Sequence, residues 1–419
     1  MRSDHRSARR LLFLLPFAPR LDATHGGGRA MAQLLARLAT RHHVALLYLR
    51  AADEPPIDPI LQERCTLVEE LMRPRTGRSP AQRWARRARL ITALPRGKPM
   101  WATDWAVTDY SRRARALVQA WRPDVVQLDY HVMGQYLSAL DACPAPRVLT
   151  EYESGASAAT DRFQSQQGLA RLVSYFDMLA WERFERTIFR DVQAIVVFTE
   201  RDREAVAHRT RRTPIVQIPL GTELPKQPLN PVGYPPWSLL FVGNFAHPPN
   251  VDAAMRLAGT ILPRVWARYP GLILHIVGDQ PARQLWQRVS PNVIVTGRVP
   301  EVTSYLDRAA VVVAPLRLGG GMRVKVLEAL AAGKAVVASP RAVEGLNLAD
   351  GEQVVLAESD EQFAEAIVQL LADSEQRASL AARARAWACA HLSWEASITA
   401  YEALYQSLID RSCRSGGQQ

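Results

Sequence analysis

The chain has 419 residues, of which 48% are hydrophobic and 22% charged, as in soluble proteins with two domains of ordinary size. This composition excludes a largely disordered chain, and no segment is long and apolar enough to span a bilayer. The four cysteines, Cys65, Cys143, Cys389 and Cys413, show no paired spacing, so the sequence indicates neither a zinc site nor a disulfide framework.

The formal net charge of +11 arises near the beginning of the chain. Residues 1–120 contain 22 Lys and Arg against 10 Asp and Glu, whereas the rest of the chain contains 30 against 31. No zinc-finger, RRM or comparable motif accompanies this charge, so a nucleic-acid partner is not indicated.

The first residues resemble a signal peptide, because the basic segment 1–10 precedes the apolar run 11–18. Pro16 interrupts that run, and no clear small-x-small cleavage site follows Ala18. We therefore interpret residues 11–17 as a buried first strand. The protein is expected to stay in the cytoplasm, either soluble or peripheral on the inner face of the plasma membrane.

Short apolar runs then alternate with longer amphipathic segments, which is the pattern of parallel sheets covered by helices on both faces. Residues 1–220 form the first predicted domain, with a helix over residues 28–40. Its predicted strands cover residues 11–17, 44–49, 124–128, 147–150, 194–198 and 215–218. Residues 221–237 are rich in proline and turn formers and indicate a linker.

The densest basic segment lies within the first domain, over residues 78–94. Trp84, Ala88 and Ile91 recur there at helical spacing, with Arg83, Arg86 and Arg87 beside them. A basic amphipathic helix of this kind can dock on an anionic membrane surface. The alternative is a solvated helix that packs Trp84 into its own domain.

A second sheet is predicted in residues 238–392. Its strands cover residues 238–243, 272–277, 293–295, 310–314, 335–338 and 354–356. Residues 393–419 are expected to form a terminal helix that returns to the first domain. The fold class is therefore α/β, with two Rossmann-like, doubly wound parallel-sheet domains that face a cleft.

Three consecutive glycines follow the apolar run 311–315 and precede a predicted helix. Glycine lets the backbone approach a ligand closely, and the unpaired N–H groups at a helix start favour an anion. Arg323 and Lys325 add two cations there, which suits a diphosphate, and Glu328 is a candidate acceptor for ribose hydroxyls. The alternative is a glycine-rich turn that only caps a helix.

Neither standard nucleotide fingerprint fits the glycines at 26–28 or at 319–321. A third glycine is missing at the required spacing in both segments, and no Gly-Lys-Ser/Thr follows either. A dinucleotide dehydrogenase and a P-loop ATPase are therefore disfavoured.

Seven short motifs occur in a characteristic order: HGGG at 25–28, FTERD at 198–202, IPLGTE at 218–223, FVGN at 241–244 with PN at 249–250, IVG at 276–278, TGRV at 296–299 and LGGGMRVKVLEAL at 318–330. In this respect the chain resembles the GT-B glycosyltransferases, specifically the retaining family-4 (group 1) enzymes of exopolysaccharide and cell-envelope biosynthesis. The resemblance implies retaining transfer of a hexose from a nucleotide diphosphate sugar to a glycan or lipid-linked acceptor. It leaves UDP, GDP and ADP as open choices for the nucleotide.

The resemblance also assigns roles to individual residues. It implies that Glu328 binds the ribose, that the backbone around Gly321 and Met322 binds the diphosphate and sugar, and that Gly26 and Gly27 meet the donor phosphates from across the cleft. The full set implied for the donor is Gly26, Gly27, Asn244, Gly319, Gly320, Gly321, Met322, Arg323, Val324, Lys325 and Glu328. The sugar and acceptor side is assigned to Glu151, Tyr152 and Glu153.

Three positions depart from the family pattern. Gly320 stands where many members carry a glutamate that contacts the transferred sugar. Asn244 and His247 occupy a loop in which many members place an Arg and a Lys, and we expect Arg323 and Lys325 to supply the missing charge. Tyr152 replaces a histidine of the first domain.

His131 is a candidate replacement for that histidine, the alternative being an ordinary buried or surface histidine.

The expected chemistry follows from charge. Breaking a glycosyl phosphate bond places negative charge on the leaving diphosphate, which backbone N–H groups, Arg323 and Lys325 would stabilise. No cofactor or metal is expected, since the chain has no Asp-x-Asp pair. Two alternatives remain: a non-catalytic relative that binds nucleotide sugars, and a nucleotide-sugar epimerase on the same fold.

Overall fold

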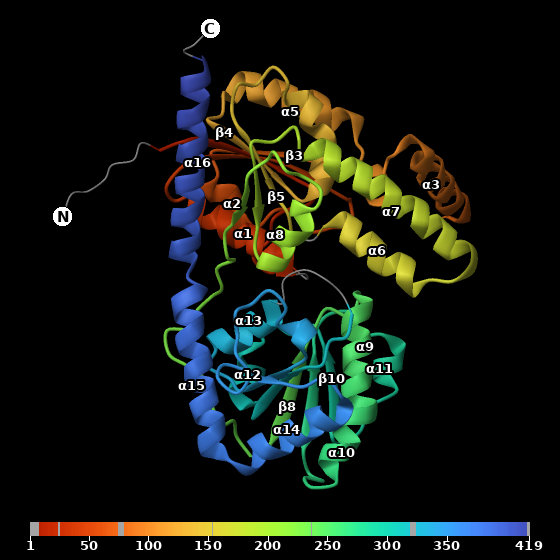
Figure 1. The fold of residues 1–419 in the computed structure, drawn as a ribbon, viewed down its shortest axis with the longest axis vertical. Helices are drawn as coiled ribbons and strands as arrows, with labels where there is room; N and C mark the ends of the chain where they lie inside the picture. The colour runs from red at the N-terminus through yellow and green to blue at the C-terminus, as the bar shows by residue number, and fades with distance from the viewer. Residues whose placement is uncertain are drawn as a thin grey trace, which may run out of the picture.

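The computed structural model describes residues 8–23, 26–73, 79–152, 154–235, 237–318 and 324–416. Two parallel sheets, one above the other in Figure 1, form separate α/β domains. This arrangement confirms the predicted fold class.

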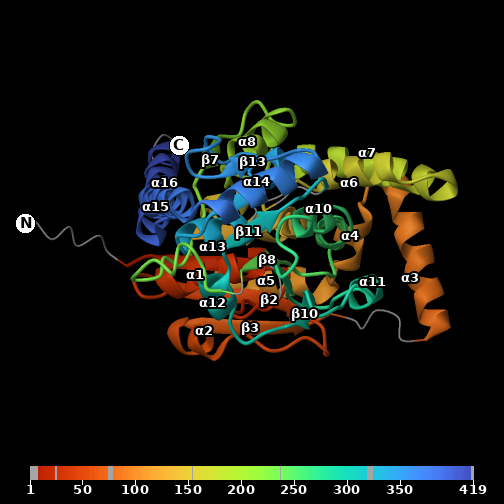
Figure 2. The same ribbon diagram turned by 90° about the horizontal axis from the view of Figure 1, so that it is seen from below.

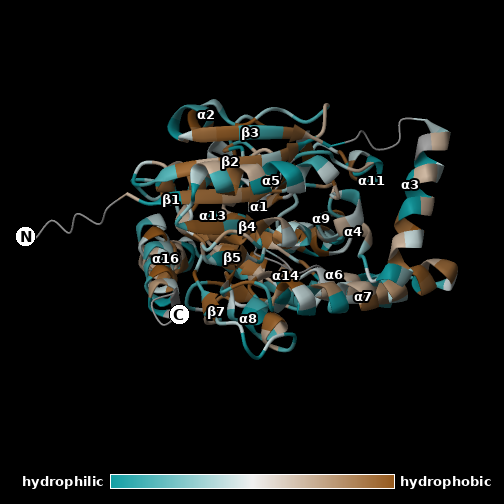
Figure 3. Cartoon of the chain, turned by 90° about the horizontal axis from the view of Figure 1, so that it is seen from above, coloured by the Kyte–Doolittle hydropathy of each residue, from teal (hydrophilic) through white to brown (hydrophobic). Residues whose placement is uncertain are grey.

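The first sheet contains seven strands in the order β3-β2-β1-β4-β5-β6-β7, all paired in parallel. The strands are β1 (Arg10–Leu15), β2 (His43–Arg50), β3 (Leu67–Met72), β4 (Val125–Asp129), β5 (Arg147–Thr150), β6 (Ala194–Val197) and β7 (Ile215–Gln217). Central strands such as β1 and β2 are nearly continuous hydrophobic runs because helices cover both faces of the sheet, and Figure 3 colours them as hydrophobic along most of their length.

Strand β3 was not predicted, because its sequence LVEELM shows no continuous apolar run. It lies at the edge of the sheet and is half-buried. Glu69 and Glu70 point to partners outside the core, since Arg113 donates to Glu69 and Arg50 donates to Glu70. A strand with only one neighbour can carry such charged side chains.

The second sheet contains six parallel strands in the order β10-β9-β8-β11-β12-β13. The strands are β8 (Ser238–Val242), β9 (Ile273–Val277), β10 (Val293–Gly297), β11 (Val311–Ala314), β12 (Val336–Ala338) and β13 (Val355–Leu356). The helices of this domain include α9 (Pro248–Arg256), α10 (Leu262–Trp266), α11 (Arg283–Trp286), α12 (Thr303–Arg308), α13 (Val324–Ala331), α14 (Asp360–Ala372) and α15 (Ser374–His391).

The last helix, α16 (Trp394–Gly416), lies against the first domain, so that α15 and α16 form a column along both domains (Figure 1). Trp394, Ile398, Tyr401 and Tyr405 are buried in the hydrophobic core of the first domain. A Cβ on Gly221 would lie 2.2 Å from the Trp394 ring. The chain therefore crosses from the first domain to the second between β7 and β8, and it returns to the first domain at α16.

The first-domain helices that cover the sheet include α1 (Gly26–Leu38), α2 (Pro59–Arg64), α5 (Thr108–Trp121) and α8 (Glu200–Ala207). Helices α3 (Pro80–Ala93), α4 (Met100–Asp104), α6 (Gly155–Ser165) and α7 (Gly168–Ile188) form a separate group, from which α3 and the start of α7 project away from the sheets (Figures 1 and 2). None of the described helices combines the length and the apolar character that crossing a membrane requires.

Helix α3 corresponds to the predicted basic amphipathic helix. Trp84 is 70% exposed and Ile91 52% exposed, so the alternative in which Trp84 packs into its own domain is wrong. Arg86 and Arg89 donate to Asp104 on α4, which anchors one side of the helix. Residue 78 lies outside the described residues.

Candidate functional site

Two helix starts that the sequence singled out, those of α1 and α13, meet at the junction of the domains. Helix α1 begins at Gly26, just beyond the carboxyl end of β1, and α13 begins at Val324, beyond the carboxyl end of β11. A Cβ on Gly26 would lie 2.7 Å from Cγ2 of Val324. Only glycine therefore allows these two helix starts to approach so closely.

Gly27 lies against two tyrosines at the ends of neighbouring strands. A Cβ on Gly27 would lie 2.2 Å from the Tyr130 hydroxyl and 3.3 Å from Cδ1 of Tyr152. The rings of Tyr130 and Tyr152 stack with centroids 4.2 Å apart, and Phe17 meets Tyr130 edge-on. Tyr130 has a φ of 69°, a strained conformation for a non-glycine residue and one that clusters at functional sites.

Glu328, the predicted ribose ligand, lies on α13 and pairs across the junction with Arg29 of α1. Nη2 of Arg29 is 3.1 Å from Oε1 of Glu328, and both side chains are about one-third exposed. Arg29 also donates to the backbone oxygen of Ala23. The Glu328 carboxylate thus lies at the junction of the domains and forms an ion pair with a cation from the first domain.

Lys325 and Asn244 belong to one hydrogen-bonded group in the second domain. Nζ of Lys325 donates to Oδ1 of Asn250 and lies 4.8 Å from the centroid of the Phe241 ring. Nδ2 of Asn250 donates to the backbone oxygen of Asn244, at 2.7 Å. Asn250 therefore connects the loop after β8 to the start of α13.

Several predicted site residues lie outside the described residues. They are Gly319, Gly320, Gly321, Met322 and Arg323 of the glycine motif, and Glu153 on the acceptor side. Of the described members of the predicted donor set, Gly26 and Gly27 lie at the start of α1, Gly26 lies against Val324 of α13, and Asn250 connects Asn244 to Lys325. Glu328 lies on the same helix as Val324 and Lys325. Their roles toward a donor remain predictions.

His131 and Glu151 are not at an open surface. His131 is 1% exposed, and the rings of Trp101 and Trp181 meet it edge-on at 5.0 and 4.7 Å. Nδ1 of His131 lies 2.5 Å from Oε1 of Glu151, which is fully buried. Because a substrate cannot reach His131 in this conformation, we interpret it as a buried structural residue rather than a catalytic one.

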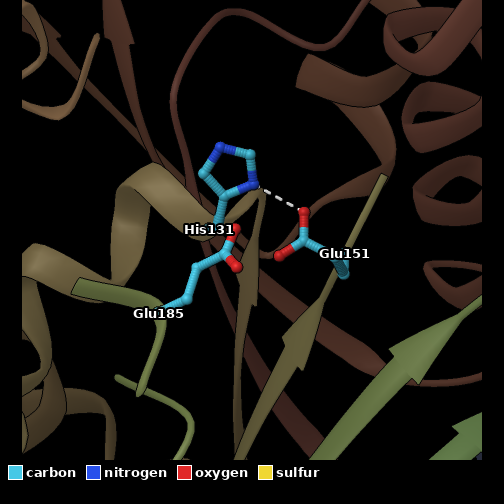
Figure 4. A group of neighbouring side chains, drawn as sticks. All are labelled: His131, Glu151 and Glu185. Atoms are coloured by element: carbon cyan, nitrogen blue, oxygen red, sulfur yellow. Dashed lines mark hydrogen bonds and ion pairs between the residues drawn. The ribbon is translucent and has the colours of Figure 1, made fainter. Parts of the chain in front are cut away.

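Glu185 of α7 completes a buried group with His131 and Glu151, and the three side chains converge in Figure 4. Burial, followed by the neighbouring charge of Glu151, raises the pKa of Glu185, while His131 and Arg209 oppose the shift. One ligand atom from each residue lies within 4.8 Å of the others, which is compatible in number with a metal site.

Two observations argue against a metal at this place. The direct 2.5 Å contact of His131 with Glu151 fills the space that an ion coordinated at about 2 Å by both groups would need. The carboxylate of Glu185 already accepts from the backbone N–H of Ala156 at 3.0 Å and pairs with Arg209 at 3.1 Å. We therefore interpret the group as an internal hydrogen-bonded network.

A second buried carboxyl group, Asp129, lies at the end of β4. It is fully buried, and Nε2 of Gln127 donates to its Oδ1 at 3.2 Å, while no hydrogen bond to Oδ2 is found among the described residues. Burial raises the pKa of Asp129 to about 7, although hydrogen bonds from Gln127 and Thr150 oppose the shift. The carboxyl is thus protonated in the folded chain over a pH range in which an unfolded aspartate is ionised.

Replacing Asp129 by asparagine should stabilise the chain in a pH-dependent manner. Between about pH 4 and pH 7 the folded state keeps a proton that the unfolded state has lost, so the contribution of Asp129 to stability falls as pH rises through this window. The stability difference, Asn variant minus wild type, should grow by up to about 4 kcal/mol from pH 4 to pH 7.5. Urea unfolding across this range measures it, and a difference that does not change with pH would contradict the assignment.

Further ion pairs cross between the domains. Arg201 lies 3.1 Å from Glu344, Arg341 lies 3.6 Å from Asp161, and a nitrogen of Arg298 donates to the backbone oxygen of Asp22 at 2.9 Å. These side chains are all partly exposed, and such pairs contribute only about 0–1 kcal/mol each. These ion pairs therefore contribute little to the free energy that holds the two domains together.

Sequence reasoning missed several members of this site. Asn250 lies within one of the sequence motifs and Arg29 directly after another, but neither was given a role, because their partners are far along the chain. Tyr130 gave no signal, since a positive φ at a non-glycine residue is not visible in sequence. The sequence feature that could have drawn attention to Asn250 is its position directly after the two prolines that begin α9.

Comparison with known proteins supports the architecture. Residues 236–373 match the family described as Glycosyl transferases group 1. Over 180 residues the chain is 31% identical to the phosphatidyl-myo-inositol mannosyltransferase of Mycolicibacterium smegmatis, a match that covers 40% of this chain and 46% of that protein. The chain thus spans less than half the length of this relative.

Solved structures match over nearly the whole chain. Sucrose-phosphate synthase from Thermosynechococcus elongatus has a TM-score of 0.70 and 18% identity, with 96% of this chain and 100% of that chain covered. HepE of Anabaena, in complex with UDP and glucose, has a TM-score of 0.64 and 12% identity, with 96% and 99% covered. At these identities the likeness shows the fold. Residues 236–373 therefore carry a Glycosyl transferases group 1 domain, in a chain whose two parallel-sheet α/β domains have the GT-B glycosyltransferase fold.

Proposed function

We propose that the chain is a retaining glycosyltransferase that moves a hexose from a nucleotide diphosphate sugar to a glycan or lipid-linked acceptor in envelope or exopolysaccharide biosynthesis. The observation that carries the proposal is the junction of two helix starts, Gly26 against Val324, with Lys325 and Glu328 in the first turns of α13. Helix starts favour anions, and a carboxylate beside them suits ribose hydroxyl donors.

The relatives support the chemical class of donor and acceptor. One is named for mannosyl transfer to a phosphatidyl-myo-inositol, and another was solved with UDP and glucose. In the proposed reaction the bond between the anomeric carbon and the diphosphate oxygen breaks, and a bond from that carbon to an acceptor oxygen forms. Lys325 and the adjoining backbone N–H groups stabilise the leaving diphosphate, which takes the acceptor proton.

A donor screen tests this proposal. UDP-glucose, GDP-mannose and ADP-glucose are each tested for thermal stabilisation of the chain and for release of nucleoside diphosphate in the presence of a lipid extract as acceptor. One donor should stabilise the chain and be consumed, and turnover should persist with a chelator. Binding without release under any acceptor would instead identify a non-catalytic relative. A modified sugar still attached to the nucleotide would identify an epimerase.

A membrane-facing position is part of the proposal, because a lipid-linked acceptor lies at a bilayer surface. The basic helix α3, with its exposed Trp84 and Ile91, is consistent with it. The positive charge of the first 120 residues would favour an anionic leaflet.

A further inference from the structure

Helix α7 carries an apolar stripe on the side that faces solvent. Its exposed members are Leu169 (84%), Leu172 (53%), Phe176 (49%) and Leu179 (41%), with Tyr175 beside them. The spacing of three and four residues places the stripe on one face of the helix. The opposite face, which includes Asp177, Trp181 and Glu185, is buried in the domain. Packing within the described chain therefore does not account for this second apolar face.

Exposed apolar side chains are concentrated on this part of the molecule. Half of the large apolar side chains that are exposed in the described residues lie on α3 and α7. The two helices project on the same side in all three ribbon views (Figures 1, 2 and 3). An ion pair of Asp161 on α6 with Arg341 places the neighbouring helix at the domain junction. The apolar surface of α7 thus adjoins a helix, α6, that contacts the second domain.

The charges on the same two helices have one predominant sign. Helix α3 contains no acidic residue, and on α7 Asp177 and Glu185 are buried while Glu182 pairs with Arg186. Arg87, Arg171 and Arg183 are exposed. A surface that combines apolar side chains with arginines and lacks unpaired exposed carboxylates on these helices is complementary to anionic lipid.

We propose that the exposed stripe of α7, residues 169–179, inserts into an anionic lipid monolayer, with the arginines of α3 and α7 at the headgroups. The choice of a membrane as partner rests on the proposed function. The binding itself requires neither donor nor acceptor, so it can fail while the transfer reaction stands. Docking through α7 would bring the candidate site to the membrane surface, where a lipid-linked acceptor is held.

Vesicle binding tests the proposal with a matched pair of variants. The test variant is Leu169→Ser/Leu172→Ser/Phe176→Ser, and the control is Trp286→Ser/Val289→Ser, two side chains about half exposed on the second domain. Neither change removes a buried side chain, so both variants should unfold at the wild-type temperature. Binding is measured by sedimentation with phosphatidylcholine vesicles, with and without about 30% phosphatidylglycerol.

Wild type and control should partition onto the anionic vesicles and not onto the neutral ones, with less binding at high salt. The α7 variant should bind the anionic vesicles at least about tenfold more weakly, because three apolar side chains no longer enter the lipid. Equal binding of the α7 variant and the wild type to anionic vesicles would overturn the proposal. Failure of the wild-type chain to sediment with anionic vesicles would also overturn it. A wild-type dimer that dissociates in the α7 variant would assign the stripe to self-association instead.

Discussion

Replacing Glu328 by alanine is expected to weaken binding of the donor nucleotide by roughly 1–3 kcal/mol, or about 5- to 150-fold in Kd. A carboxylate that accepts hydrogen bonds from two ribose hydroxyls contributes in this range, because the bonds are assisted by charge. Isothermal titration with the nucleotide found in the donor screen measures the change. The transfer reaction should be affected mainly through KM if the ribose is held equally in the ground state and the transition state.

The ion pair with Arg29 does not prevent this role. The two side chains are about one-third exposed, and an exposed pair of this kind contributes only about 0–1 kcal/mol. Hydrogen bonds from the ribose to the same carboxylate are worth more, so the nucleotide can displace the guanidinium. Once released, Arg29 remains at the start of α1, near the place where the diphosphate is expected. In the proposed function, the pair would hold Glu328 in place until the donor nucleotide displaces Arg29.

Glu344→Ala is the matched control for Glu328→Ala. Glu344 also pairs with an arginine across the domain junction, Arg201, at the same distance of 3.1 Å and with a similar exposure. It lies outside the predicted donor set. If both variants lose nucleotide affinity equally, the effect of Glu328 comes from domain closure rather than ribose binding. Unchanged affinity of Glu328→Ala would remove Glu328 from the site.

Much of the fold could be predicted because the buried strands carry their own signal. Strands such as β1 and β6 are nearly continuous apolar runs, since helices cover both faces of a parallel sheet. Edge strand β3 was missed for the complementary reason: half of its surface faces solvent, and its two glutamates break the apolar pattern. The hydrophobic pattern of a strand thus depends on how much of the strand is buried, and it is weakest in edge strands.

The site was only partly predictable, because its residues depend on contacts between distant segments. The glycine segments marked the helix starts, yet nothing in the sequence joins Arg29 to Glu328, 299 positions later. His131 had the residue type of a catalytic group, but Trp101 and Trp181 enclose it. Local spacing can therefore indicate which backbone approaches a ligand, whereas it cannot tell whether a side chain faces the cleft or the core.

Gly27→Ala is expected to lower kcat by roughly a hundredfold with little loss of stability. The added methyl would overlap the Tyr130 hydroxyl, 2.2 Å away, and Tyr130 is held by its stacking on Tyr152 and its contact with Phe17. Either the glycine segment or the tyrosine must move by about 1 Å, and the predicted phosphate contacts move with it. Alanine favours a helix more than glycine does, so the start of α1 is not weakened by propensity. Steady-state kinetics and thermal unfolding together separate the two effects.

A second substitution should partly restore the activity of the Gly27→Ala variant. Tyr130→Phe removes the hydroxyl, so the nearest remaining neighbours of the alanine methyl are Cδ1 of Tyr152 at 3.3 Å and Cζ of residue 130 at 3.4 Å, which are tight but tolerable contacts. Gly271→Ala is the control, because nothing lies within 4 Å of a Cβ there, and it should behave as wild type. Wild-type kcat in Gly27→Ala, or no rescue by Tyr130→Phe, would show that close packing at Gly27 is not what the reaction requires.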